Sequence, residues 1–235
     1  MKKVITPVLW LSYLVCFSQQ NFINVPSGDV TSCKKVFFQE QLNFNESIQS
    51  NTTIDLGIGK GFELGVNILG LDFDLKQKAL IVNNSNDVDP YNPLIGINGL
   101  KRFNINKYFS VAGGFQAGIN FRDNRRAKSA SLFYSNFSIT NLWLEESKLI
   151  MGMYYNSRHY GGPGQRLGAW CGAEVPFSKR WHLMAESILG NNALSYTSVG
   201  VVYYAKRKIP LTLGVQIPNI PRNSYALVFE FTFSP

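Results

Sequence analysis

The chain has 235 residues and a formal net charge of +8, yet only 16% of its residues are charged. An ordinary soluble domain carries roughly 25% charged residues. Aromatic residues make up 14% of the chain, which excludes an intrinsically disordered protein, because such chains are poor in aromatic residues and rich in charge. The length is that of a single domain.

The first residues have the order of a secretory signal peptide. A basic start precedes an apolar stretch from Val4 to Val15, and small and polar residues follow it. A membrane anchor would need about 18 to 20 apolar residues. Cys16 as the acylated cysteine of a lipoprotein is a further alternative, but the residue before it is not small. We expect residues 1–18 to be removed, 19–34 to form an N-terminal periplasmic segment, and 35–235 to form the folded domain.

Beyond that segment the hydrophobic pattern has a period of two. Apolar residues alternate with small or polar ones over Phe109–Phe121, and again over Leu211–Ile217 and Tyr225–Phe233. This pattern is typical of strands with one apolar face. The other face consists of Gly, Ser, Asn and Gln, whereas a soluble sandwich exposes Lys, Glu and Thr. An apolar exterior around a narrow polar lumen favours a transmembrane barrel, since only helices and closed barrels satisfy their backbone hydrogen bonds in lipid.

Short and long turns alternate along the chain. Tight turns such as 59–61 and 206–208 are separated by longer polar connections such as 76–93 and 156–165. In outer-membrane barrels the short turns are periplasmic and the long loops extracellular. An even number of strands then places both termini in the periplasm.

The turns delimit about twelve strands of roughly ten residues, close to the length that spans a bilayer. The alternation is weakest in three of them, so a barrel of ten strands is the alternative. The expected strands lie at 35–45, 50–58, 62–74, 94–103, 108–121, 129–140, 148–157, 166–176, 181–190, 194–205, 209–217 and 223–233.

The segment Tyr225-Ala-Leu-Val-Phe-Glu-Phe-Thr-Phe233, the signal peptide and the alternating strands together resemble Gram-negative outer-membrane β-barrel proteins. In that family the last strand typically ends in alternating aromatic residues that the barrel-assembly machinery reads. This chain departs from the pattern at Ser234-Pro235, which follow the last Phe. The resemblance implies an all-β, antiparallel up-and-down barrel in the cell outer membrane. It also implies outer-membrane lipid, lipopolysaccharide and the assembly machinery as partners, but no particular substrate.

The sequence carries no CxxC, HExxH or phosphate-binding glycine signature. Outer-membrane phospholipases and lipid A deacylases resemble one another in placing a His and a Ser two residues apart on one strand face, where the imidazole can take the hydroxyl proton. His159 and His182 each lack that serine. His182 and Glu186 share a face but are separated by about 13 Å of strand, too far for a hydrogen bond. We therefore expect no enzyme, no cofactor, no metal and no nucleic-acid partner.

The parity opposite the apolar face predicts which charged residues line the lumen. They are Asp55, Glu63, Arg102, Glu174, His182, Glu186 and Glu230. The predicted extracellular loops are basic, with Arg122, Arg125, Arg126, Lys128, Arg158 and Arg166. In one interpretation the lumen charges pair and close the barrel. In the other they line a narrow pathway with an electropositive mouth, and basic loops also suit contact with anionic lipopolysaccharide.

Two classes of function follow from this pattern. The first is a narrow channel or transport barrel for small solutes. The second is a non-conducting surface or accessory barrel that binds lipopolysaccharide or a protein partner, and an outer-membrane lipid hydrolase ranks third. The channel is favoured because many predicted inward residues are Gly, Ser and Asn, which leave space that a closed core would fill.

Overall fold

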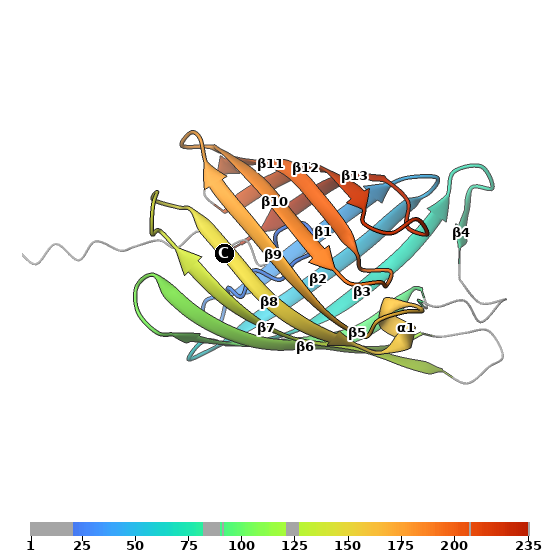
Figure 1. Ribbon diagram of the computed structural model, residues 1–235, viewed down its shortest axis with the longest axis horizontal. Helices are drawn as coiled ribbons and strands as arrows, with labels where there is room; N and C mark the ends of the chain where they lie inside the picture. Colours follow the sequence, from blue (N-terminus) through green and yellow to red (C-terminus); the bar gives the residue numbers. More distant parts are fainter. Residues whose placement is uncertain (1–20, 82–89, 91, 121–126, 207, 235) are drawn as a thin grey trace, which may run out of the picture.

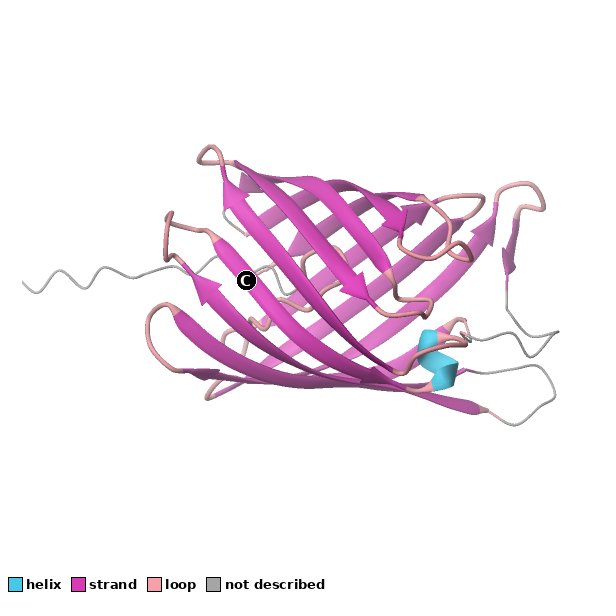
Figure 2. Ribbon diagram, viewed as in Figure 1, coloured by secondary structure: helices cyan, strands magenta, loops and turns pink. Residues whose placement is uncertain are grey.

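A computed structural model describes residues 21–81, 90, 92–120, 127–206 and 208–234. The strands of this part of the chain form a closed antiparallel barrel, and Figure 2 shows that they make up almost the whole wall. Their bounds are β1 (Val36–Phe44), β2 (Ile48–Gly59), β3 (Phe62–Asp74), β4 (Ala79–Ile81), β5 (Leu94–Asn104), β6 (Phe109–Asn120), β7 (Lys128–Thr140), β8 (Lys148–Asn156), β9 (Leu167–Pro176), β10 (Trp181–Leu189), β11 (Tyr196–Lys206), β12 (Ile209–Pro218) and β13 (Ala226–Phe233). A single helical turn, α1 (Arg158–Gly161), follows β8.

The predicted twelve-stranded barrel is confirmed. Within the described ranges, twelve strands form a ring in which the first strand, β1, pairs with the last, β13, and the pairing of β2 with β3 completes the closure. The three residues of β4 extend the end of β3 outside the ring. The observed strands begin and end within three residues of the predicted limits. Both β4 and α1 are too short to show a period in the sequence, so neither was predicted.

The two ends of the barrel differ in their connections. The tight-turn end carries the connections 60–61, 105–108, 141–147 and 177–180, whereas the long-loop end carries 157–166, 190–195 and 219–225. At the first tight turn, Gly59, Lys60 and Gly61 all have positive φ. Figure 1 shows α1 and β4 together at the long-loop end. No helix in the described ranges is long and apolar enough to cross a membrane.

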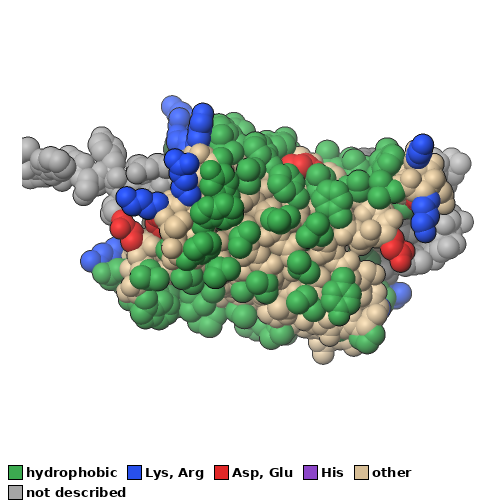
Figure 3. All heavy atoms as spheres, turned by 90° about the horizontal axis from the view of Figure 1, so that it is seen from above, with side chains coloured by type: hydrophobic (Ala, Val, Ile, Leu, Met, Phe, Trp, Pro, Cys, Tyr) green, Lys and Arg blue, Asp and Glu red, His purple; other side chains and the backbone are tan. Residues whose placement is uncertain are grey.

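The outer face of the wall is apolar. Phe133 of β7, Leu183 of β10, Leu213 of β12 and Phe229 of β13 are all exposed on it. Figure 3 shows hydrophobic side chains covering the wall, with Lys and Arg gathered at the two ends. Such a surface is unfavourable in water and suited to hydrocarbon. The exterior is therefore that of a membrane barrel.

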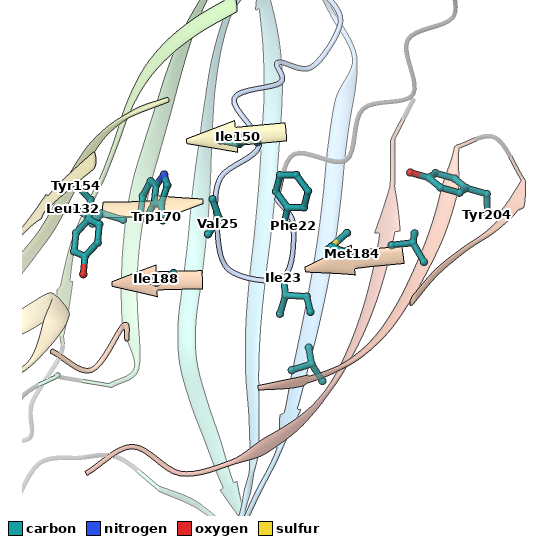
Figure 4. Packing of buried hydrophobic residues seen from close by; sticks show 12 residues of the cluster. Phe22, Ile23, Val25, Leu132, Ile150, Tyr154, Trp170, Met184, Ile188 and Tyr204 are labelled. Atoms are coloured by element: carbon teal, nitrogen blue, oxygen red, sulfur yellow. The ribbon is translucent and has the colours of Figure 1, made fainter. Parts of the chain in front are cut away.

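The N-terminal residues do not lie where the sequence placed them. We expected residues 19–34 to lie in the periplasm, but their described part, 21–34, which we call the plug segment, lies inside the barrel. Phe22, Ile23 and Val25 are at most 1% exposed, and Figure 4 shows them among side chains of the wall. In this short segment Phe22, Ile23, Val25 and Val30 are not regularly spaced, so no period reveals its position. The predicted signal peptide, 1–18, lies outside the described residues.

The lumen is also less polar than predicted. The plug segment packs against inward-facing residues of the wall to form one buried apolar cluster. The cluster comprises Phe22, Ile23 and Val25 with Leu132, Ile150, Tyr154, Trp170, Met184, Ile188, Val202, Tyr204 and Val228. Burying a large apolar side chain contributes roughly 1.5 to 3 kcal/mol, so this cluster favours a filled lumen over an open polar one.

Inward glycines provide the room for this filling. A Cβ atom at Gly172 would lie 3.2 Å from the ring of Phe22, and one at Gly214 would lie 2.7 Å from the Cδ1 atom of Ile23. Within the wall, Gly114 and Gly168 similarly face the rings of Tyr134 and Tyr154. The inward glycines therefore do not leave the open space that we took as favouring a channel, because aromatic and aliphatic side chains occupy it.

Leu213 tests the membrane exterior, because it lies at the middle of β12 and points outward. We expect Leu213→Arg to lower the free energy of unfolding in lipid by about 2 to 4 kcal/mol, since the charge enters the hydrocarbon midplane. Ile105→Arg is the matched control. Ile105 is more exposed but lies in a tight turn, where we expect a change of about 1 kcal/mol or less. Urea unfolding in lipid vesicles measures both, and equal effects would contradict the membrane placement.

Candidate functional site

Glu186 of β10 holds the tip of the plug segment. Its carboxylate accepts hydrogen bonds from the backbone N–H groups of Ile23 (3.1 Å), Asn24 (2.9 Å) and Val25 (2.9 Å). The side-chain amide of Asn24 donates a further bond of 2.9 Å. Successive backbone N–H groups that converge in this way form an anion-binding concavity, and hydrogen bonds to a charged acceptor are the strong ones. The tip is therefore fixed to one point of the wall.

The tip is itself a tight turn. The backbone N–H of Phe22 donates to the carbonyl of Val25 at 2.9 Å, and Asn21 forms an isolated β-bridge with Pro26. The turn aligns the N–H groups toward Glu186. Next along the segment, the side-chain amide of Asn136 on β7 donates to the carbonyl of Pro26 at 2.6 Å.

The remainder of the plug segment is held near the tight-turn end. Asp29 forms ion pairs with Arg102 of β5 and Lys148 of β8. The backbone N–H of Thr31 donates to the Oε2 atom of Glu63 on β3 at 2.7 Å. Bonds to Gln39 on β1, Gly57 on β2 and Ser198 on β11 add to these contacts. With Glu186 and Asn136, eight strands thus hold the segment through polar contacts, and several of these satisfy backbone groups that would otherwise be buried without partners.

The structure places the predicted lumen-lining residues on the inner face but divides them between different contacts. Asp55, Glu63, Glu174, His182, Glu186 and Glu230 are buried, and the side chain of Arg102 is 16% exposed. Three of them, Glu63, Arg102 and Glu186, contact the plug segment, so the predicted lumen charges do not form one ring around an open path. Glu230 accepts a hydrogen bond of 3.3 Å from the Thr232 hydroxyl within its own strand.

A second group of charges lies toward the tight-turn end. His182 Nδ1 lies 2.7 Å from Oε1 of Glu174, and the Tyr204 hydroxyl donates to the same oxygen at 2.9 Å. On its other side, His182 Nε2 lies 3.7 Å from Glu146 in a tight turn. The polar partners of His182 are thus two carboxylates, and the ring of Tyr204 lies against it with centroids 4.7 Å apart.

Only part of the predicted basic surface is described. Arg122, Arg125 and Arg126 lie outside the described residues. Lys128 begins β7, Arg158 begins α1 and Arg166 immediately precedes β9, so all three lie at the long-loop end. Arg222 was not predicted, although it lies in one of the loops that the sequence identified. Its guanidinium donates to the carbonyl of Asn191 at 2.6 Å.

A cavity of about 420 Å³ lies between the plug segment and the long-loop end, and we call it the vestibule. Its floor is formed by the plug residues Asn21, Ile23, Asn24 and Pro26. Its volume lies within the range of roughly 300 to 1,000 Å³ that is typical of small-molecule sites. Twelve of the thirty described residues that line it are Asn or Gln. The vestibule is therefore a chamber that combines amide groups with apolar side chains and ends at the plug segment.

Several lining residues were visible in the sequence but were not singled out. Gln39, Gln41 and Asn43 alternate along β1 on the face opposite its apolar residues, so parity alone places them inward. The residues predicted to line the lumen were all titratable, so these amides were missed. Tyr160 of α1 also lines the vestibule, and its hydroxyl donates to Gln116. Burial raises the pKa of Tyr160, which keeps that hydroxyl protonated as a donor.

Comparison with solved structures finds barrels of the same fold. One is described as "KdgM porin in complex with disordered oligogalacturonate" and another as "KdgM porin". Each matches with a TM-score of 0.58 and 11% sequence identity, over 85% of this chain and 99% of the other. At this identity the likeness shows the fold alone, and it confirms the barrel that the sequence predicted. Neither a protein-family model nor a curated protein matches the chain.

Glu186→Gln tests the anchor of the plug segment. The variant removes the negative charge and places an NH₂ group opposite backbone N–H donors. A hydrogen bond to a charged group contributes about 1.5 to 3 kcal/mol to stability. We expect the amides of residues 21–26 to exchange with deuterium about tenfold faster or more, measured by mass spectrometry.

Glu174→Gln is the matched control, because Glu174 is equally buried but bonds to His182 and Tyr204 instead of the plug segment. We expect it to lower the melting temperature while exchange at 21–26 stays unchanged. If both variants speed exchange at 21–26 to the same extent, Glu186 is not a specific anchor.

Proposed function

We propose that the protein is an integral outer-membrane channel or transport barrel for small solutes, whose path is closed by the plug segment in the conformation described. One observation carries this proposal. The vestibule leads from the long-loop end to a plug that is held by hydrogen bonds, ion pairs and apolar packing. Contacts of this kind are reversible. The solved porin whose description names oligogalacturonate has the same fold, which supports a solute as the partner here.

In this proposal the long-loop end is extracellular and the tight-turn end is periplasmic, as in outer-membrane barrels. Lys128, Arg158 and Arg166 then lie on the outer side, where they would contact anionic lipopolysaccharide. Residues 1–18 would serve as the signal peptide, and the barrel-assembly machinery would insert the processed chain.

A second candidate is a non-conducting barrel that binds a partner at its outer surface. The filled lumen favours it, because the apolar cluster and the plug segment together occupy the middle of the barrel. We rank this second, since a vestibule of about 420 Å³ above the plug is a feature that a purely structural barrel does not need.

The proposal includes no enzymatic activity. The described partners of buried His182 are Glu174, Glu146 and the ring of Tyr204, so no serine hydroxyl is placed there to become a nucleophile. For this reason a lipid hydrolase ranks below the other two candidates.

A disulfide between the plug segment and the wall tests whether the plug must move for conduction. A Cβ atom at Gly28 would lie 3.3 Å from the Cβ atom of Ala112 on β6, close to the separation of about 3.5 to 4.5 Å in disulfides. We expect Gly28→Cys with Ala112→Cys, in a Cys33→Ser and Cys171→Ser background, to conduct when reduced. When oxidised, conductance in planar bilayers should fall about tenfold or more.

The single variant Gly28→Cys, under the same oxidant, is the control, because it shares the strain of a side chain at positive φ but cannot form the bridge. Equal conductance of the oxidised and reduced double variant would show that the path does not require the plug to move. Absence of conductance in the wild-type chain as well would overturn the channel and favour the non-conducting barrel.

A further inference from the structure

Amide side chains are the main polar groups of the vestibule wall. Its twelve amide side chains come from the plug segment, from strands on several sides of the barrel and from the loops above. Each amide offers both donors and an acceptor, so the wall can pair with groups that also donate and accept. Hydroxyl groups have that property, whereas a carboxylate or phosphate only accepts.

Charge is sparse in this chamber. Among the described lining residues there is no Asp, Glu or Lys, and the basic side chains are Arg222 and His159. Arg222 already donates to the backbone oxygen of Asn191 at 2.6 Å and to its side-chain oxygen at 3.3 Å. An anion that entered would lose hydration without a matching set of cations, which is costly. The wall therefore favours an uncharged solute.

One side chain that lines the chamber has a buried amide nitrogen without an acceptor among the described residues. Gln39 is 2% exposed, and its Oε1 accepts a hydrogen bond from Asn21 at 2.8 Å. Its Nε2 atom has no acceptor among the described residues. Buried donors are normally hydrogen-bonded, so this unsatisfied donor would gain a partner if a ligand oxygen reached it.

Aromatic side chains complete the lining. Tyr160, Trp170 and Tyr196 contribute to the chamber. Trp170 is fixed by stacking on Tyr154, with centroids 5.1 Å apart, and by a hydrogen bond of 2.6 Å to Asn136. Flat apolar faces beside many hydrogen-bonding groups suit a solute that has both C–H faces and hydroxyl edges.

We propose that the vestibule binds an uncharged, hydroxyl-rich solute of the saccharide class. This inference rests on the proposed function, because it names the solute that the channel would take. The binding contacts themselves lie on the outer side of the plug segment, so binding can be measured separately from conduction.

The test is isothermal titration calorimetry on the refolded chain in a detergent without a sugar headgroup, such as a dimethylamine oxide. The probes are maltotriose and N,N′,N″-triacetylchitotriose, which are uncharged, and trigalacturonate, which is anionic and of similar size. We expect an uncharged trisaccharide to bind with a Kd below about 1 mM and trigalacturonate to bind about tenfold more weakly or not at all. Added salt should leave the binding of the uncharged probe unchanged, because no ion pair is involved.

Gln39→Leu and Gln216→Leu test the wall itself. Both residues line the vestibule and are at most 5% exposed, and the change removes the amide while keeping a similar volume. We expect the two together to weaken binding about tenfold, as the loss of two hydrogen bonds implies. Gln216→Leu alone leaves the Asn21 contact of Gln39 intact and should show part of the loss. Gln77→Leu, on an exposed turn outside the vestibule, is the matched control and should bind as the wild type does.

The outcomes separate this inference from the proposed function. If no uncharged trisaccharide binds, or if trigalacturonate binds as tightly or more tightly, the inference is overturned even when the barrel conducts. If an uncharged trisaccharide binds with the expected loss in the Gln variants but the barrel never conducts, the site stands and the channel fails. Equal losses in Gln77→Leu and the wall variants would also overturn it.

Discussion

The buried carboxylate of Glu186 is the contact on which the interior of this barrel depends. A carboxylate in the middle of a barrel is costly unless its lone pairs are occupied, and the turn at 22–25 supplies backbone donors that fit it. This contact fixes the height of the plug segment in the lumen. The packing of Phe22 and Ile23 and the floor of the vestibule both follow from that height.

The interior then divides into layers with different physics. Toward the tight-turn end the contacts are ionic, because Asp29 forms ion pairs with Arg102 and Lys148. In the middle, the apolar cluster surrounds the hydrogen bonds of Glu186. Above the tip, in the vestibule, the main polar groups are amides, and the chamber carries little charge. A solute that enters from the long-loop end therefore passes the basic residues of the loops and then meets a chamber with little charge, and the ionic contacts of Asp29 lie on the far side of the apolar layer.

The wall could be predicted from the sequence, because period-two alternation in lipid leaves few alternatives. Strand limits, the strand number and the inward parity of Glu63 and Glu186 all follow from it. What the inward residues contact could not be predicted, because parity gives a direction but no partner. Gly172 and Gly214 illustrate this. In the sequence these glycines suggest open space in the lumen. In the structure they make room for Phe22 and Ile23, whose positions in the chain are far from the two glycines.

The plug segment contacts residues that are far from it in the chain, and this separation affects the order in which the barrel folds. The segment precedes every described strand in the chain, but Ile23 bonds to a residue 163 positions later. Its other polar partners lie on β1, β2, β3, β5, β7, β8 and β11. Contacts of such long range form late, because the entropy of loop closure must be overcome before they are gained. The ring, moreover, closes by joining β1, directly after the plug segment, to β13, the last strand. A segment that precedes the whole wall in the chain is therefore among the last to be placed, and the barrel must enclose it as the final seam forms.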